Sequence, residues 1–201
     1  GMNFAAVVPN SEDAVVIPEG YRQNVVIRWG DPVVAGAPEF DVRNQTAAAQ
    51  RGQFGFNNDF AGLLPIPGFP DRYLLVVSHE YTTEQFMFPG YDPDNPTREQ
   101  VEIALAAHGL SVVEVERGPD GLTPILGRYN RRLTAESPFL LTGPAAGSEF
   151  VVTAADPSGR AVTGSLNNCA GGITPWGTVL SGEENFHIYF GAAGGSAAPS
   201  A

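Results

Sequence analysis

The sequence contains no lysine, only one cysteine and no long apolar run, and each absence narrows the classes of protein it can belong to. All eleven basic residues are arginines and the formal net charge is −11, which argues against a basic surface for nucleic acid. A single cysteine excludes a disulfide within the chain. No apolar run approaches the roughly 20 residues that cross a bilayer, so we expect no membrane span.

Several sequence motifs are also missing. The first basic residue is Arg22, so no charged segment precedes an apolar one, and we expect no signal peptide in this chain. No Gly-x-Ser-x-Gly elbow occurs, which argues against a serine hydrolase of that class. The glycines at 143–147 lack the Lys-Ser/Thr ending of a phosphate-binding loop. No strong internal repeat stands out, so periodicity alone does not select a propeller.

The residues that are present predict short strands separated by turns. The chain has 201 residues, 43% of them apolar, with 24 glycines and 17 prolines, which fits one turn-rich domain or a large piece of one. Apolar or alternating segments predict strands at Tyr21–Trp29, Arg72–His79, Leu110–Arg117, Leu122–Tyr129, Glu149–Thr153, Ala161–Leu166 and Thr178–Leu180. The segment Asn185–Phe190 also reads as strand-like.

One helix is predicted after Thr97, which forms a capping-box pair with Gln100 ahead of an apolar face at helical spacing. We therefore expect an all-β fold of short antiparallel strands with one or two short helices, arranged as a sandwich, barrel or propeller. Residues 1–20 are expected to form an irregular lead-in, and residues 21–190 the β domain. Residues 191–201 are only Gly, Ala, Ser and Pro, and they are expected to form a flexible tail.

Two stretches near the C-terminal end carry candidate metal ligands. Cys169 precedes a glycine pair, where the backbone can approach a ligand closely, and its thiolate could bind a transition metal or attack an electrophile. A small buried cysteine in a turn is the alternative. Glu183 and Glu184 offer carboxylates to a hard cation such as calcium, or form a solvated acidic turn. Adjacent side chains of an extended chain point to opposite faces, so only one of the two glutamates faces a given site unless a bulge intervenes.

Three further segments carry polar side chains of interest. Asn57 and Asp59 lie within an aromatic frame and form either a calcium-binding loop or an Asx turn. Glu80 follows an apolar strand, where polar residues are well placed for a site, and its neighbour His79 is either a ligand or a structural histidine. The segment Asn130-Arg131-Arg132 could hold a phosphate through a guanidinium group, although surface pairing with carboxylates is the favoured alternative.

These segments, in the order in which they occur along the chain, resemble the PhoX-type alkaline phosphatases. The matching stretches are Phe54–Phe60 (FGFNNDF), Val77–Tyr81 (VSHEY), Met87–Gly90 (MFPG), Ala106–Glu114 (AAHGLSVVE), Asn130–Ala135 (NRRLTA), Leu141–Gly147 (LTGPAAG) and above all Leu166–Asn185 (LNNCAGGITPWGTVLSGEEN). They run from about residue 50 to residue 190, and the last is long enough that chance is a poor explanation.

The resemblance implies part of a β-propeller that carries a mixed iron–calcium cofactor and hydrolyses phosphomonoesters in the periplasm or outside the cell. By resemblance, Cys169 matches the cysteine that ligates iron and Glu184 a cofactor-binding carboxylate. Glu80, Asn57 and Asp59 are carried over as oxygen ligands or near-ligands, and Glu183 is a second-rank candidate. Thiolate suits iron, and carboxylate and amide oxygens suit calcium.

Two departures from the family pattern limit what the resemblance implies. Members commonly carry a second cysteine where this chain has Gly182, and the family site draws further acidic and arginine residues from later in a longer chain. We therefore expect a phosphatase segment that holds part of the metal site and is inactive alone. The alternatives are a non-catalytic calcium-binding or interaction domain on the same scaffold and a calcium-dependent lactonase-type propeller. Exposed strand edges also favour self-association into a homo-oligomer.

Overall fold

The computed structural model describes residues 4–190, and the expected tail at 191–201 lies outside the described residues. Its centre is a five-stranded antiparallel sheet in the order β1-β2-β3-β4, in which β5 pairs with the first part of β3 and β4 with the second part. The strands are β1 (Asn58–Ile66), β2 (Phe69–His79), β3 (Gly109–Gly118), β4 (Gly121–Ile125) and β5 (Arg131–Leu133). Two further hairpins follow, β6 (Pro138–Leu140) with β7 (Ala161–Thr163) and β8 (Asn168–Ile173) with β9 (Val179–Glu183).

Short helices occupy the connections. They are α1 (Ala47–Gln50), α2 (Glu84–Met87), α3 (Arg98–Ala107) and the 3-10 turns η1 (Glu149–Val151) and η2 (Phe186–Tyr189). Helix α3 starts at the predicted capping box, with Thr97 accepting from the amide of Gln100 and Gln100 accepting from the amide of Thr97. Gly109 follows the helix at a φ of +91° and begins β3, where a Cβ would lie 2.0 Å from the carbonyl oxygen of Leu133. The antiparallel, strand-rich architecture confirms the predicted all-β class.

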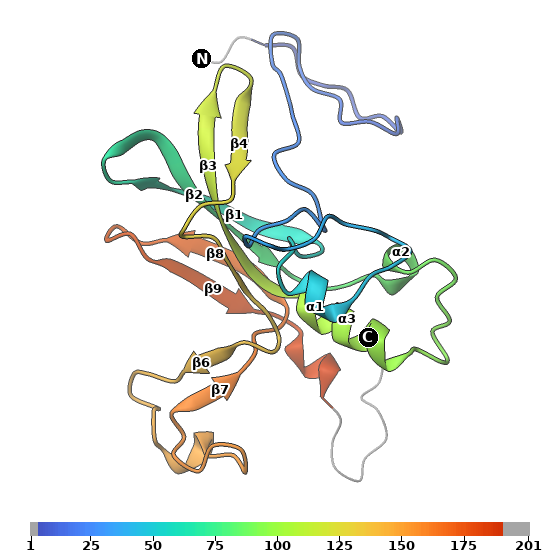
Figure 1. Cartoon of the computed structure of the whole chain (residues 1–201). Coiled ribbons are helices and arrows are strands. Elements are labelled where there is room, and N and C mark those ends of the chain that lie inside the picture. Colours follow the sequence, from blue (N-terminus) through green and yellow to red (C-terminus); the bar gives the residue numbers. More distant parts are fainter. Residues whose placement is uncertain (1–3, 191–201) are drawn as a thin grey trace.

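Successive side chains of β2 and β3 point to opposite faces of the central sheet. Apolar clusters cover both of these faces. On one face, Val77 and Val113 pack with Phe54 and with the irregular N-terminal segment around Val26. On the other face a second apolar cluster includes Val76, Leu110, Val112 and, from the last hairpin, Val179. Figure 1 shows the β8–β9 hairpin lying beside the central sheet, while the β6–β7 hairpin projects away from it. The second face therefore attaches the C-terminal hairpin to the central sheet.

Three strand predictions were wrong, each for an identifiable reason. Residues Tyr21–Trp29 form no strand, since Val26 and Ile27 are held by packing onto the sheet without a hydrogen-bonded partner strand. Glu149–Thr153 contains the turn η1. Asn185 adopts the left-handed conformation at a φ of +49°, which ends the extended chain and starts η2 within the segment predicted as strand-like.

The remaining predicted strands are present over part or all of their length. Strand β2 contains Arg72–His79, and β3 contains Leu110–Arg117. A tight turn at Gly118–Gly121 joins β3 to β4. Strands β4, β7 and β9 are offset from or shorter than the predicted segments. The structure adds β1, β5, β6 and β8, none of which was predicted as a strand. None of the helices among residues 4–190 is long and apolar enough to cross a membrane.

Candidate metal centre

Three side chains distant in sequence meet at one point beside the central sheet. Asp59 lies in β1, Glu80 directly follows β2, and Cys169 lies in β8. One donor atom from each lies within 4.8 Å of the other two. A thiol and two carboxylates at this spacing can reach a single cation, so the Asp59–Glu80–Cys169 cluster is the candidate metal centre.

A buried serine aligns the strands that bear these donors. The Oγ atom of Ser78, fully buried near the end of β2, accepts from the amide of Phe60 at 2.9 Å and donates to the carbonyl of Cys169 at 3.1 Å. The Sγ atom of Cys169 in turn donates to Oδ2 of Asp59 at 2.8 Å. Sequence reasoning missed Ser78 as a site residue, because a serine at the end of an apolar strand carries no motif of its own.

The close approach of β8 to β1 depends on a glycine. A Cβ atom placed on Gly171 would lie 2.5 Å from the ring of Phe60, inside van der Waals contact. The predicted role of the glycine pair after Cys169, to let the backbone come close, therefore applies to packing of β8 against an aromatic ring. This contact brings Cys169 to within reach of Asp59.

Glu184 adds a third negative charge to the cluster. Burial first, and then the charges of Asp59 and Glu184, raise the pKa of Glu80 above its usual value, and a hydrogen bond from Cys169 partly offsets this. Hydrogen bonds to Asp59 and then to Glu184 raise the pKa of the Cys169 thiol to about 12. The thiol is therefore protonated at neutral pH when no cation is present.

No arginine neutralises this group of acids within the described part of the chain. The ion pairs found between residues 4 and 190 are Arg51–Glu136, Arg72–Glu116 and Arg98–Glu102, and none includes a residue of the cluster. Nearby, Oδ1 of Asn167 is buried without a hydrogen-bond partner among the described residues. Clustered carboxylates with a thiol and no counter-charge fit a cation, with a soft donor for a transition metal and hard oxygens for calcium.

The other two predicted ligands have different surroundings. Asn57 has a φ of +50°, and its carbonyl accepts from the amide of Glu80 at 3.0 Å, so its backbone touches the site. Glu183 points away from its neighbour Glu184. Its Oε1 atom accepts from Oγ of Ser165 at 2.8 Å and from the amide of Leu166 at 3.0 Å. The structure therefore brings Glu184 toward Cys169 and does not bring the Glu183 carboxylate into the cluster.

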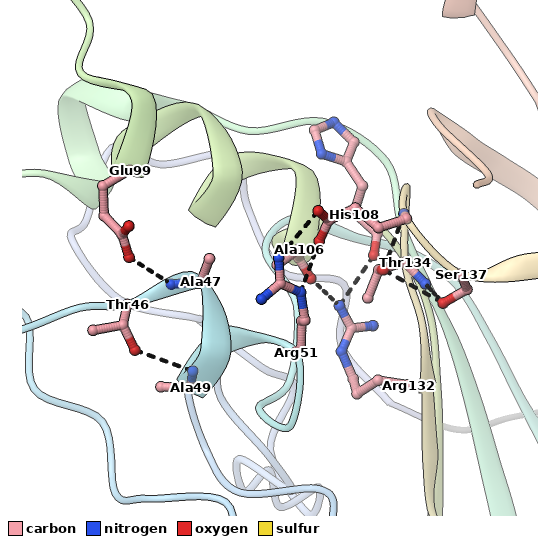
Figure 2. A network of polar contacts seen from close by, with 11 residues as sticks. Thr46, Ala47, Ala49, Arg51, Glu99, Ala106, His108, Arg132, Thr134 and Ser137 are labelled. Carbon is pink, nitrogen blue, oxygen red and sulfur yellow. Dashed lines mark hydrogen bonds and ion pairs between the residues drawn. The ribbon is translucent and has the colours of Figure 1, made fainter. Parts of the chain in front are cut away.

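Two candidate side chains are buried in the protein interior instead. The guanidinium of Arg132 donates to the carbonyls of Ala106 and His108 at 2.7 and 3.0 Å, at the C-terminal end of α3 (Figure 2). Neither phosphate binding nor surface pairing describes Arg132, since its guanidinium is buried and both Nη atoms donate to backbone carbonyls. Burial also lowers its pKa to about 9. His79 is fully buried, with Nε2 2.7 Å from Oγ of Ser111, and burial holds its pKa well below the usual range.

The sequence matches the family model of alkaline phosphatase PhoX over residues 2–199. The chain belongs to the PhoX family. Its structure is similar to Pseudomonas fluorescens PhoX in complex with vanadate, a transition state analogue, with 44% sequence identity and a TM-score of 0.83. A search of curated proteins found no match.

The match to this PhoX structure covers 89% of the present chain but 31% of the other chain. The likeness confirms the predicted fold class, part of a β-propeller-like architecture, and it confirms the predicted family. The present chain thus spans about a third of the length of the PhoX structure it resembles.

Proposed function

We propose that this chain carries part of the metal site of a PhoX-type phosphatase, and that the protein containing it hydrolyses phosphomonoesters. The observation that carries the proposal is the cluster itself: Asp59, Glu80 and Cys169 place their donor atoms within 4.8 Å of one another in a chain of the PhoX family. The similar PhoX structure holds vanadate as a transition state analogue, which supports phosphoryl chemistry for the family scaffold.

The donor chemistry suggests how a mixed iron–calcium cofactor would be held. Cys169 would bind iron, because thiolate is the softest donor in the cluster. Asp59, Glu80 and Glu184 would supply oxygens to iron or calcium. Asn57 would contribute in second rank.

Glu183 is also a second-rank candidate. Its hydrogen bonds to Ser165 and Leu166 favour a supporting role for its carboxylate over direct binding.

When bound, the metals would neutralise the phosphoryl oxygens and activate the attacking nucleophile. The residues of this chain would prepare the site for that role. Ser78 fixes the backbone of Cys169. Asp59 accepts a hydrogen bond from the Cys169 thiol at 2.8 Å, so its carboxylate would be the first acceptor of the thiol proton when a cation binds the sulfur. Glu80, with its raised pKa, can hold a proton closer to neutral pH than an ordinary glutamate.

We further propose that the chain by itself turns over substrate negligibly, since the family site draws residues from parts of the longer chain that have no counterpart here. The test compares this chain with a longer protein that contains it. Elemental analysis should find iron together with calcium in the longer protein, and p-nitrophenyl phosphate should be hydrolysed by it and not by the short chain. Calcium without iron, and no hydrolysis after iron loading, would favour a non-catalytic calcium-binding or interaction domain. Robust turnover by the short chain would overturn the partial-site proposal alone.

The family resemblance and the exposed apolar side chains also support proposals for cellular location and for self-association. The resemblance supports a periplasmic or secreted protein. Large apolar side chains are exposed on the C-terminal hairpins and turns, among them Leu140 at 84%, Phe150 at 91% and Trp176 at 77% exposure. Such a surface supports self-association of this chain, which light scattering after size-exclusion chromatography would reveal as a mass above that of the monomer.

A further inference from the structure

The β1–β2 hairpin contains a bulge at the point where it contributes to the cluster. Asn58 pairs with His79, and the next pair is Ala61 with Val77, so β1 advances by one residue more than β2. Asp59 and Phe60 of β1 therefore lie opposite the single residue Ser78 of β2, and Asp59 directly follows Asn58. A bulge of this kind turns a side chain out of the regular alternation and aims it at a site.

The β8–β9 hairpin contains the same bulge at the same place. Asn168 pairs with Glu183, and the next pair is Gly171 with Ser181, so β8 advances by one residue more than β9 between these pairs. Cys169 occupies the position that Asp59 occupies in the first hairpin. The two hairpins therefore have one pairing scheme, residue for residue, although their sequences share little beyond an Asn-Asn pair, a glycine and a glutamate.

The backbone just before each bulge is also repeated. Asn57 and Asn167 both adopt the left-handed conformation, at φ values of +50° and +52°. The carbonyl of Asn57 accepts from the amide of Glu80 at 3.0 Å, and the carbonyl of Asn167 accepts from the amide of Glu184 at 2.9 Å. In each hairpin a left-handed asparagine thus fixes the backbone of the glutamate that follows the second strand.

Even the residue before each glutamate has a matching contact. Nε2 of His79 accepts from the amide of Gly55 at 3.3 Å, two residues before the left-handed Asn57. Oε1 of Glu183 accepts from Oγ of Ser165 and from the amide of Leu166, at the corresponding place before the second hairpin. Each side chain ties the incoming segment to its hairpin, which explains why the Glu183 carboxylate is turned away from the cluster.

We infer that the metal centre consists of two equivalent half-sites, Asp59 with Glu80 and Cys169 with Glu184, and that the position occupied by Asp59 in one and Cys169 in the other sets the preference between hard and soft cations. The inference rests on the proposed function, because it concerns donors to the proposed cofactor. The glutamates are the same in both half-sites, so the choice of oxygen or sulfur at the bulge is the difference in donor chemistry between them.

If the half-sites are equivalent, they make a prediction that would not follow from a role of Cys169 at its own position alone. The sulfur donor should work from either bulge, since each presents its side chain to the same point and the two side chains already touch at 2.8 Å. Exchanging the two residues should therefore preserve a one-thiolate site. Removing the thiol from both positions should leave a site of oxygen donors only.

The test titrates the 201-residue chain with cobalt(II) under reducing conditions and follows the thiolate-to-cobalt absorption in the near ultraviolet. The variants are Cys169→Asp, the exchange D59C/C169D, and the matched control D59S/C169D, which differs from the exchange by one oxygen in place of sulfur. Circular dichroism verifies that each variant folds. We expect the absorption in the wild type, its loss in Cys169→Asp and in the control, and its return in the exchange variant with cobalt affinity within about tenfold of the wild type.

The outcomes separate this inference from the proposed function. If the wild type shows no thiolate-to-cobalt absorption, the proposed site fails and the inference fails with it. If the wild type shows the absorption but a folded exchange variant does not, the half-sites are not equivalent and the inference alone is overturned. Should the exchange variant not fold, the Asp59→Cys single variant decides: a second thiolate at the bulge must increase the absorption per cobalt, and an unchanged absorption contradicts the inference.

Discussion

Cys169 donates a hydrogen bond from its thiol to Oδ2 of Asp59 at 2.8 Å, and this contact sets the chemistry of the thiol in the absence of a cation. Hydrogen bonds to Asp59 and Glu184 stabilise the protonated form, which raises the pKa of the thiol to about 12. An unmetallated Cys169 should therefore be a poor nucleophile although it is only half-buried.

Replacing Asp59 by Asn is expected to make Cys169 more reactive. Loss of the carboxylate lowers the pKa of the thiol, and the thiolate fraction at pH 8 rises by roughly tenfold for each unit by which the pKa falls. The rate of reaction with a disulfide reagent such as DTNB, measured on metal-free protein, reports this change. Asp71→Asn, at an exposed position of β2 remote from the cluster, is the matched control and should leave the rate unchanged. Equal rates in both variants would contradict the assignment of the shift to Asp59.

Transition-metal affinity is expected to rise with pH. The thiol is protonated below its pKa of about 12, so a metal that binds the thiolate must displace one proton across the physiological range. The apparent affinity for cobalt should therefore increase by about tenfold for each pH unit from about pH 6 to about pH 8. The Cys169→Asp variant, whose carboxylate is already ionised there, should lose most of this slope. A pH-independent wild-type affinity would show that the thiol is not a ligand.

Substitutions of Asn57 test whether its backbone conformation or its side chain contributes to cation binding. Its left-handed φ of +50° costs a residue with a branched side chain about 1–2 kcal/mol, whereas glycine adopts it freely. We expect Asn57→Gly to keep the cobalt affinity of the wild type and Asn57→Val to lose both affinity and stability, as measured by titration and urea unfolding. If Asn57→Gly also loses cobalt affinity while remaining as stable as the wild type, the side chain of Asn57 is itself a ligand.

Arg132 is expected to stabilise the fold without taking part in binding phosphate. Its guanidinium donates to three carbonyls, those of Leu110 from Nη1 and of Ala106 and His108 from Nη2. The single ammonium nitrogen of a lysine cannot occupy both of these positions at once. Arg132→Lys should lower the free energy of unfolding by about 2–4 kcal/mol in urea denaturation, because buried acceptors lose their donors. Arg131→Lys, at the exposed neighbouring position, should change it by less than about 0.5 kcal/mol. Equal effects would contradict this role.

The parts of the fold that sequence predicted are those with a strong local signal. The capping box of Thr97 and Gln100 predicts helix α3. The alternation of Val113 and Val115 with glutamates predicts β3. Strand β8 contains Gly171 and Gly172, which have low strand propensity, and only its pairing with β9 and packing against β1 make it a strand.

The candidate site shows the same division. Local motifs and the family resemblance pointed to Asp59, Glu80 and Cys169 separately, but their meeting depends on tertiary packing of β8 against β1. The repeated hairpin escaped detection in the sequence because hydrogen-bond register and backbone conformation carry it, with few shared residue types. Ser78, whose hydroxyl joins both strands, could be recognised only once its two partners were placed.

The distance along the chain between Asp59 and Cys169, 110 positions, gives a bound cation a second effect. A cation held by both residues would cross-link the chain, and closing so large a loop removes much of the conformational freedom of the unfolded state. Because this chain has a single cysteine, it cannot form an internal disulfide. The bound metal would instead provide a cross-link like that of a disulfide. Metal loading should then slow global unfolding, and a chelator should release the C-terminal hairpin from the central sheet before the sheet itself melts.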